Sequence, residues 1–75
     1  MHVLFYTKPG CQLCEEAKLM MQLAQEDVPL TWTEVNIEED DEVHEKYMLM
    51  IPVIEVNGNV ALFGSIGYVD VLELF

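Results

Sequence analysis

Apolar and polar positions follow one another along this chain with the periods of strands and helices in turn. Residues 2–7 hold a short continuous apolar run rich in β-formers, which predicts a strand buried on both faces. From about residue 12 to residue 26, apolar side chains recur at spacings of three and four, which predicts an amphipathic helix. The apolar side chains of that helix are Leu13, Ala17, Met20, Met21 and Ala24.

The pattern continues with a strand and a short helix. Residues 30–35 alternate as a strand does, and residues 36–41 form a polar break. A short helix is expected at about residues 40–47, because its first positions are carboxylates that suit the positive end of a helix dipole.

The last third of the chain predicts a hairpin and a final helix. Residues 51–56 and 59–63 are expected to be paired strands, because Asn57-Gly58 between them is a strong hairpin signal. A short helix should follow Gly64-Ser65 and end at Phe75. Its predicted inner residues are Ile66, Val69, Leu72 and Phe75.

The predicted order β-α-β-α-β-β-α makes residues 1–75 a single α/β domain. The first β-α-β unit implies two parallel strands joined by a right-handed crossover. The hairpin adds an antiparallel pair, so we expect a four-stranded mixed sheet flanked by helices on both faces.

Composition and charge narrow the functional classes. Hydrophobic residues make up 52% of the chain, enough for one compact core, yet no apolar run is long enough to span a bilayer. The N-terminus does not resemble a signal peptide, so we expect a cytoplasmic protein. Three lysines and no arginine face fourteen carboxylates, for a net charge of −11. Nucleic acids and anionic membranes are therefore unfavourable partners. The charge is best explained by solubility alone, although it could also steer the domain toward a basic patch on another protein.

The candidate chemistry lies in Cys11-Gln12-Leu13-Cys14, which holds both cysteines of the chain. A loop this short makes a poor structural staple, which favours a redox dithiol. Cys11 falls at a predicted helix N-terminus near Lys8, and both features favour its thiolate. Glu15 and Glu16 oppose that effect, so we expect a modestly lowered pKa for Cys11. Cys14, one turn later, could resolve a mixed disulfide formed by Cys11.

Two other functions remain open at this point. A zinc or iron–sulfur site usually needs four ligands, and only His2 and His44 could add to the cysteines, with no known spacing. A metal or cluster carrier would therefore share its cysteine ligands between two chains. A binding module that keeps the fold without turnover is the other alternative, although such a module has no need of both sulfurs.

The segment Tyr6-Thr7-Lys8-Pro9-Gly10-Cys11-Gln12-Leu13-Cys14, with Ile51-Pro52-Val53 later in the chain, resembles the glutaredoxin branch of the thioredoxin-fold superfamily. The resemblance is strongest to a small glutaredoxin-like group with a G-C-x-L-C segment. It implies a thiol–disulfide oxidoreductase in which Cys11 attacks and Cys14 resolves. It also implies that Pro52 is a cis-proline facing the cysteines. The backbone of Ile51 would then pair with an extended substrate.

The resemblance also suggests partners. It implies a monomer without a bound cofactor that reduces a disulfide in a protein or small molecule. Glutathione or a reductase would supply the electrons, and Lys8 could hold the carboxylate of glutathione. The chain departs from common glutaredoxins at Gln12 and Leu13, and residues 63–67 lack the usual Gly-Gly pair, with Asp70 shifted. The apolar residues 48–50 before Pro52 could contact substrate, although core filling explains them better.

Overall fold

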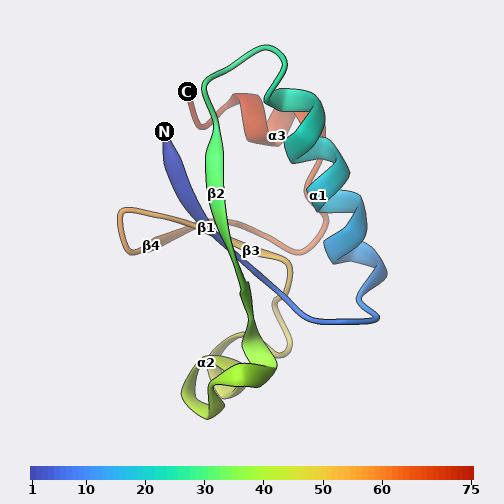
Figure 1. The fold of residues 1–75 in the computed structure, drawn as a ribbon, viewed down its shortest axis with the longest axis vertical. Coiled ribbons are helices and arrows are strands. Elements are labelled where there is room, and N and C mark those ends of the chain that lie inside the picture. Colours follow the sequence, from blue (N-terminus) through green and yellow to red (C-terminus); the bar gives the residue numbers. More distant parts are fainter.

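The computed structural model describes residues 1–75 and contains four strands and three α-helices (Figure 1). In chain order the elements are β1 (His2–Thr7), α1 (Gln12–Ala24), β2 (Thr31–Asn36), the 3₁₀ helix η1 (Ile37–Glu39), α2 (Asp41–Tyr47), β3 (Val53–Val56), β4 (Asn59–Phe63) and α3 (Tyr68–Leu72). This order confirms the predicted β-α-β-α-β-β-α arrangement. No helix is both long and apolar enough to cross a membrane.

The sheet has the strand order β2-β1-β3-β4. β1 and β2 run parallel, while β3 runs antiparallel to both β1 and β4. The sheet is therefore mixed, as the sequence predicts. The hairpin turn between β3 and β4 has positive φ at Asn57 (53°) and Gly58 (82°), the backbone that this dipeptide favours.

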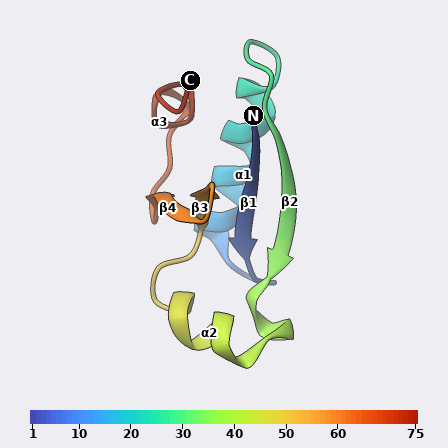
Figure 2. The ribbon, with the colours of Figure 1, turned by 90° about the vertical axis from the view of Figure 1, so that its left-hand side faces the viewer.

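Side chains from the two faces of the sheet form two separate clusters. The cluster on the α1 face is entirely apolar and consists of Val3, Phe5, Ala17, Met21, Ala24, Leu30, Ile54, Ile66 and Val71. The cluster on the α2 face consists of Tyr6, Ile37, Tyr47 and Val53. Alternation along each strand explains the division, because Phe5 and Ile54 point to one face while Tyr6 and Val53 point to the other. Figure 2 shows α3 near the N-terminal end of β1 and α2 beyond the C-terminal ends of β1 and β2.

Of the five apolar side chains expected along α1, three are buried, Met20 is half-buried and Leu13 is exposed. The buried residues of α1 are Cys14, Ala17, Met21 and Ala24, whereas Leu13 is 45% exposed. At 3.6 residues per turn, these four residues define a stripe that passes through Cys14 and leaves Leu13 at its edge. The more deeply buried residue of the first turn is thus a cysteine.

The prediction for the last helix also needs correction. Val71 is fully buried, while Val69 is 62% exposed and Phe75 is 47% exposed. α3 starts only at Tyr68, after Gly67 as its cap. Ile66 is buried but precedes the helix, so helical spacing counted from Ile66 selects the wrong side chains.

Segment boundaries differ modestly from the prediction. α1 ends at Ala24 instead of residue 26, and β3 begins at Val53, after Pro52. The polar break at residues 36–41 contains η1, because Ile37 is fully buried in the cluster on the α2 face. The Asn36 side chain caps this short helix by accepting a hydrogen bond from the Glu38 amide.

Candidate active site

Cys11 and Cys14 form a disulfide at the start of α1, and their Cα atoms are 5.2 Å apart. Cys11 is the N-cap residue of the helix, with an extended backbone. Its Sγ accepts a hydrogen bond from the Cys14 amide at 3.2 Å. Cys11 is partly exposed, whereas Cys14 is only 2% exposed. The two sulfurs thus differ strongly in their access to solvent.

The turn before Cys11 explains why the helix begins there. Gly10 has a φ of +78°, a conformation that suits glycine, and Pro9 precedes it. The Glu15 amide donates to the Cys11 carbonyl at 3.1 Å, which is the first bond of the helix. The Cys11 sulfur takes the position usually held by the oxygen of a serine or aspartate cap. An anion at this sulfur would therefore meet free amide groups and the positive end of the helix.

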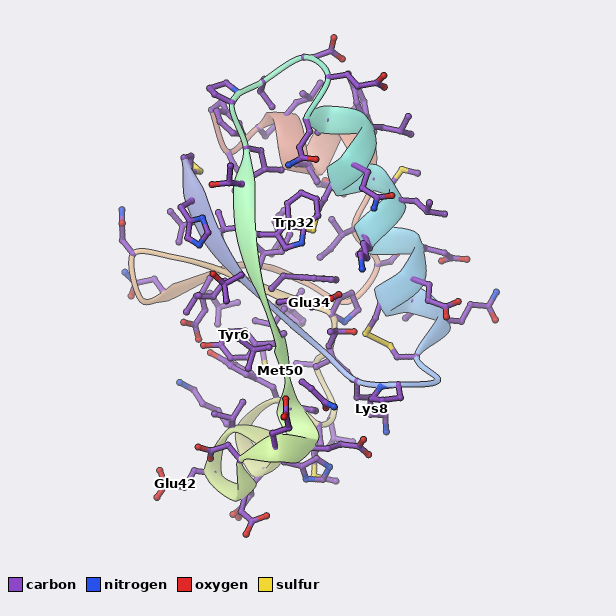
Figure 3. All side chains as sticks on the ribbon, viewed as in Figure 1. Tyr6, Lys8, Trp32, Glu34, Glu42 and Met50 are labelled. Atoms are coloured by element: carbon purple, nitrogen blue, oxygen red, sulfur yellow. A yellow bond between two sulfur atoms is a disulfide. The ribbon has the colours of Figure 1, made fainter.

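An open cavity of about 360 Å³ lies beside the disulfide. Its lining is mostly polar and consists of Thr7, Lys8, Pro9, Gly10, Cys14, Glu15, Lys18, Glu34, Asn36 and Glu39. Two of the three lysines are in this lining, and Lys18 forms a salt bridge with Glu34 at 3.4 Å. Figure 3 shows Lys8 on the loop next to the disulfide and Glu34 on β2. Cys14, the buried partner in the disulfide, is therefore part of the lining of a water-accessible, charged recess.

The Pro52 segment lies at the same end of the sheet. The Ile51–Pro52 peptide bond is cis, as the resemblance implied. Val53 pairs with Tyr6, which puts the buried Pro52 level with Thr7, just before the turn that leads to Cys11. The Ile51 amide donates to the Tyr47 carbonyl at 3.1 Å, and the Ile51 carbonyl accepts no bond from the backbone. Only the carbonyl of Ile51 is thus free to pair with an extended segment.

The apolar residues before Pro52 have two different environments. Leu49 is 92% exposed and Met48 is 45% exposed, whereas Met50 packs against the cluster on the α2 face. Core filling therefore accounts for Met50 alone. Leu49 and Met48 offer apolar surface on the segment that leads to Pro52.

Sequence reasoning missed a buried polar pair behind this segment. Glu55 is 8% exposed in β3, and the Tyr47 hydroxyl donates a hydrogen bond to its carboxylate. The ring of Tyr6 lies 4.8 Å from that of Tyr47. Burial, reinforced by the Glu55 carboxylate, raises the pKa of both Tyr6 and Tyr47 to about 12. The sequence signal for this pair was Glu55, the only carboxylate in the predicted strand at residues 51–56.

In the segment that follows β4, Asp70 has a structural role at the start of α3. The Asp70 carboxylate accepts a hydrogen bond from the Gly67 amide at 2.8 Å and thereby caps α3. Nearby, the Tyr68 hydroxyl donates to Asp27, and this bond raises the pKa of Tyr68. No group of three or more His, Cys, Asp or Glu side chains converges as a metal-ion site would require.

Comparison with known proteins agrees with this geometry. Residues 2–73 match the family model described as "Glutaredoxin-like domain (DUF836)". A structural-genomics target protein from X. campestris has a similar fold, with a TM-score of 0.82, 19% identity, and coverage of 96% of this chain and 92% of that one. A thioredoxin variant from Halobacterium salinarum has a TM-score of 0.68 at 13% identity, covering 97% of this chain and 69% of that one. A malarial protein has a TM-score of 0.65 at 16% identity, with 97% and 90% covered. At these identities the solved structures establish the shared thioredoxin-like fold.

Proposed function

The chain belongs to the glutaredoxin-like domain family, and from that premise we propose that it is a thiol–disulfide oxidoreductase acting through Cys11 and Cys14. The observation that carries the proposal is the cysteine pair at the start of α1, with the Cys14 amide donating to the Cys11 sulfur. In the reduced protein the same amide would donate to a Cys11 thiolate and favour the charged form.

The difference in exposure supports the division of roles. Cys11 is the more accessible sulfur, so its thiolate attacks a substrate disulfide. One new sulfur–sulfur bond joins Cys11 to the substrate, the substrate's own disulfide breaks, and the departing thiolate takes up a proton from water.

The buried Cys14 completes the reaction. Its thiol loses a proton and attacks the Cys11 sulfur, which closes the Cys11–Cys14 disulfide and releases the second substrate thiolate. The open cavity beside Cys14 gives that proton a route to solvent. The substrate gains two electrons, and the protein loses two.

The substrate would lie along the Pro52 segment. The resemblance suggests that an extended polypeptide pairs with Ile51 beside Pro52, and the unpaired carbonyl of Ile51 supports a single backbone hydrogen bond there. The exposed Leu49 and Met48 would add apolar contact. Lys8 in the cavity lining is the cation available for a substrate carboxylate.

Two glutathione molecules, each supplying one thiol, or a reductase would return two electrons to the Cys11–Cys14 disulfide. In this proposal the protein acts in the cytoplasm as a monomer without a resident cofactor. A donor comparison decides the reductant: the protein and an excess of a peptide disulfide are incubated either with glutathione, glutathione reductase and NADPH, or with thioredoxin reductase and NADPH, and the rate without the protein is subtracted. Sustained NADPH oxidation with one donor alone identifies the reductant. If neither mixture oxidises NADPH, neither glutathione nor thioredoxin reductase is the electron donor.

Cysteine variants test the mechanism directly. Cys11→Ser should abolish reduction of a peptide disulfide, because no attacking thiolate remains. Cys14→Ser should accumulate a mixed disulfide between Cys11 and the peptide, visible by mass spectrometry, because no resolving thiol remains. Normal turnover by Cys11→Ser would overturn the proposal. A coloured cluster bridging two chains would instead support the carrier alternative.

A further inference from the structure

Tyr47, the last residue of α2, makes hydrogen bonds through both its side chain and its main chain. Its hydroxyl donates to the Glu55 carboxylate in β3. Its main-chain carbonyl accepts from the amides of Met50, at 2.8 Å, and Ile51, at 3.1 Å. A single residue, only 2% exposed, therefore links the interior of the sheet to the residues directly before Pro52.

Glu55 needs the hydrogen bond from Tyr47, because its carboxylate is buried. It is the only buried residue with a charged side chain, and the single salt bridge of the structure joins two other residues, Lys18 and Glu34. Removing a carboxylate from water is costly unless hydrogen bonds replace the water, so the Tyr47 hydroxyl is strongly held in place. An apolar side chain at position 55 would fill the space without this requirement. The pair is therefore better explained by the position that it fixes than by stability.

The segment between α2 and β3 has a second point of attachment. The Gly64 amide, at the end of β4, donates to the Met50 carbonyl at 3.1 Å and to the Pro52 carbonyl at 2.9 Å. Gly64 thus holds the segment from β4, while Tyr47 holds it from α2. Leu49, between the two attachments, is 92% exposed and contributes little packing of its own.

We infer that Tyr47 and Glu55 are positioning residues, which hold the Ile51 main chain where an extended substrate meets the Cys11–Cys14 pair. This inference rests on the proposed function. Neither side chain takes part in sulfur chemistry. The Tyr47–Glu55 bond orients Tyr47, the Tyr47 carbonyl orients the Ile51 amide, and the Ile51 carbonyl is thereby directed away to accept a substrate N–H.

The inference predicts a dependence on the kind of substrate. A disulfide within a peptide has backbone amides that can donate to the Ile51 carbonyl. Bis(2-hydroxyethyl) disulfide has no amide and depends on the cysteines alone. Tyr47→Phe removes only the hydroxyl and should raise the KM for the peptide disulfide about tenfold, with kcat little changed. Turnover of bis(2-hydroxyethyl) disulfide should stay within about twofold of wild type.

The chain offers a matched control for this substitution. Tyr68 also makes a hydroxyl–carboxylate bond, to Asp27, but this bond is exposed, whereas the Tyr47–Glu55 bond is buried. Tyr68→Phe should therefore leave both substrates unaffected. Glu55→Gln keeps an acceptor oxygen for the Tyr47 hydroxyl, so its peptide KM should lie closer to wild type than that of Tyr47→Phe.

A double variant separates positioning from stability. Tyr47→Phe leaves a buried carboxylate without its partner, whereas adding Glu55→Leu removes that carboxylate as well. The double variant should regain stability in urea denaturation, yet retain the raised peptide KM. Recovery of the KM together with stability would overturn the inference.

Amide hydrogen exchange measured by NMR tests the inference without any turnover. In oxidised Tyr47→Phe, the Met50 and Ile51 amides should exchange about tenfold faster relative to the amides of α1, and Tyr68→Phe should show no such change. Equal exchange in the two variants would overturn the positioning role. If the wild-type protein reduced no disulfide at all, the proposed function would fall, while the exchange result would still decide what Tyr47 holds.

Discussion

The two faces of the sheet are built in different ways. The cluster on the α1 face has nine buried residues, all of them apolar. The cluster on the α2 face has four buried residues, two of which are tyrosines, with the Glu55 carboxylate bonded to one of them. Apolar burial is non-directional and mainly supplies stability, whereas a hydrogen bond fixes the relative position of two groups. We therefore regard the α1 face as the stabilising face and the α2 face as the positioning face.

The two halves of the candidate site come from these different faces. Cys14 is buried along the inner stripe of α1, while the segment before Pro52 leaves α2 at Tyr47. They meet at the end of the sheet where β1 ends and β3 begins. A site assembled in this way can lose its substrate contacts without losing its disulfide, because different faces of the sheet support the two.

The largest expected effect is the loss of a buried side chain from the α1 face. Met21 is fully buried there, and Met21→Ala should lower the free energy of unfolding by about 2–5 kcal/mol. Ile37 is also fully buried but belongs to the smaller cluster, so the cavity left by Ile37→Ala should collapse more easily and cost less. Urea denaturation of the oxidised proteins measures both. A larger loss for Ile37→Ala would contradict the assignment of the stabilising face.

Alkaline pH should weaken the α2 face, where the pKa values of two tyrosines are raised. Tyr6 and Tyr47 keep their protons up to a pKa of about 12 in the folded protein, whereas an unfolded tyrosine titrates near 10. The stability that they contribute is therefore complete below pH 10 and is lost as the pH rises from 10 to 12. Across this window the free energy of unfolding should fall by on the order of 1 kcal/mol per pH unit for each tyrosine.

Denaturation at pH 9 and pH 11 measures this loss, and Tyr6→Phe provides the comparison. The variant should show a shallower decline than wild type, since one of the tyrosines with a raised pKa no longer releases a proton. The nine buried residues on the α1 face include no titratable side chain, so a variant such as Met21→Ala should keep the wild-type slope. An identical slope in Tyr6→Phe and wild type would argue against the raised pKa of Tyr6.

A smaller effect is expected at the start of α3, where a polar contact supports the α1 face. The Asp70 carboxylate accepts the Gly67 amide at 2.8 Å. Asp70→Ala should lower the free energy of unfolding by about 1 kcal/mol, because the Gly67 amide loses its acceptor and α3 loses its cap. Thermal unfolding should show a correspondingly lower Tm, while reduction of a peptide disulfide should proceed at the wild-type rate. A marked fall in peptide turnover would instead implicate Asp70 in substrate binding.

The smallest effect is expected at the surface salt bridge. The Lys18 and Glu34 side chains are 41% and 42% exposed, and their charged atoms are 3.4 Å apart. Lys18→Gln should change the free energy of unfolding by less than about 0.5 kcal/mol, since solvent and salt screen such pairs. A loss above 1 kcal/mol in urea denaturation would show that this pair stabilises the cavity beside Cys14.

The predicted strand bounds and buried residues agree with the structure at some positions and differ at others. The strand Asn59–Phe63 has the predicted bounds, because a hairpin signal precedes it and the turn backbone suits Asn57-Gly58. Helical spacing correctly selected Ala17 and Met21 as buried residues, but it also selected Leu13. Leu13 is adjacent to the buried Cys14 in sequence, and both positions fit the helical period almost equally well. Ile37 looked like part of a polar break because its burial comes from residues distant in the chain.

The sequence alone determined the order of the elements, the mixed sheet and the position of the cysteine pair at a helix start. These features follow from local periodicity and turn chemistry, which neighbouring residues carry by themselves. The tertiary structure decided which sulfur is buried and how Tyr47 bonds both to Glu55 and to the segment before Pro52. Such contacts depend on which side chains meet when helices pack against a sheet, and no local pattern specifies a hydrogen bond between a helix end and a strand interior.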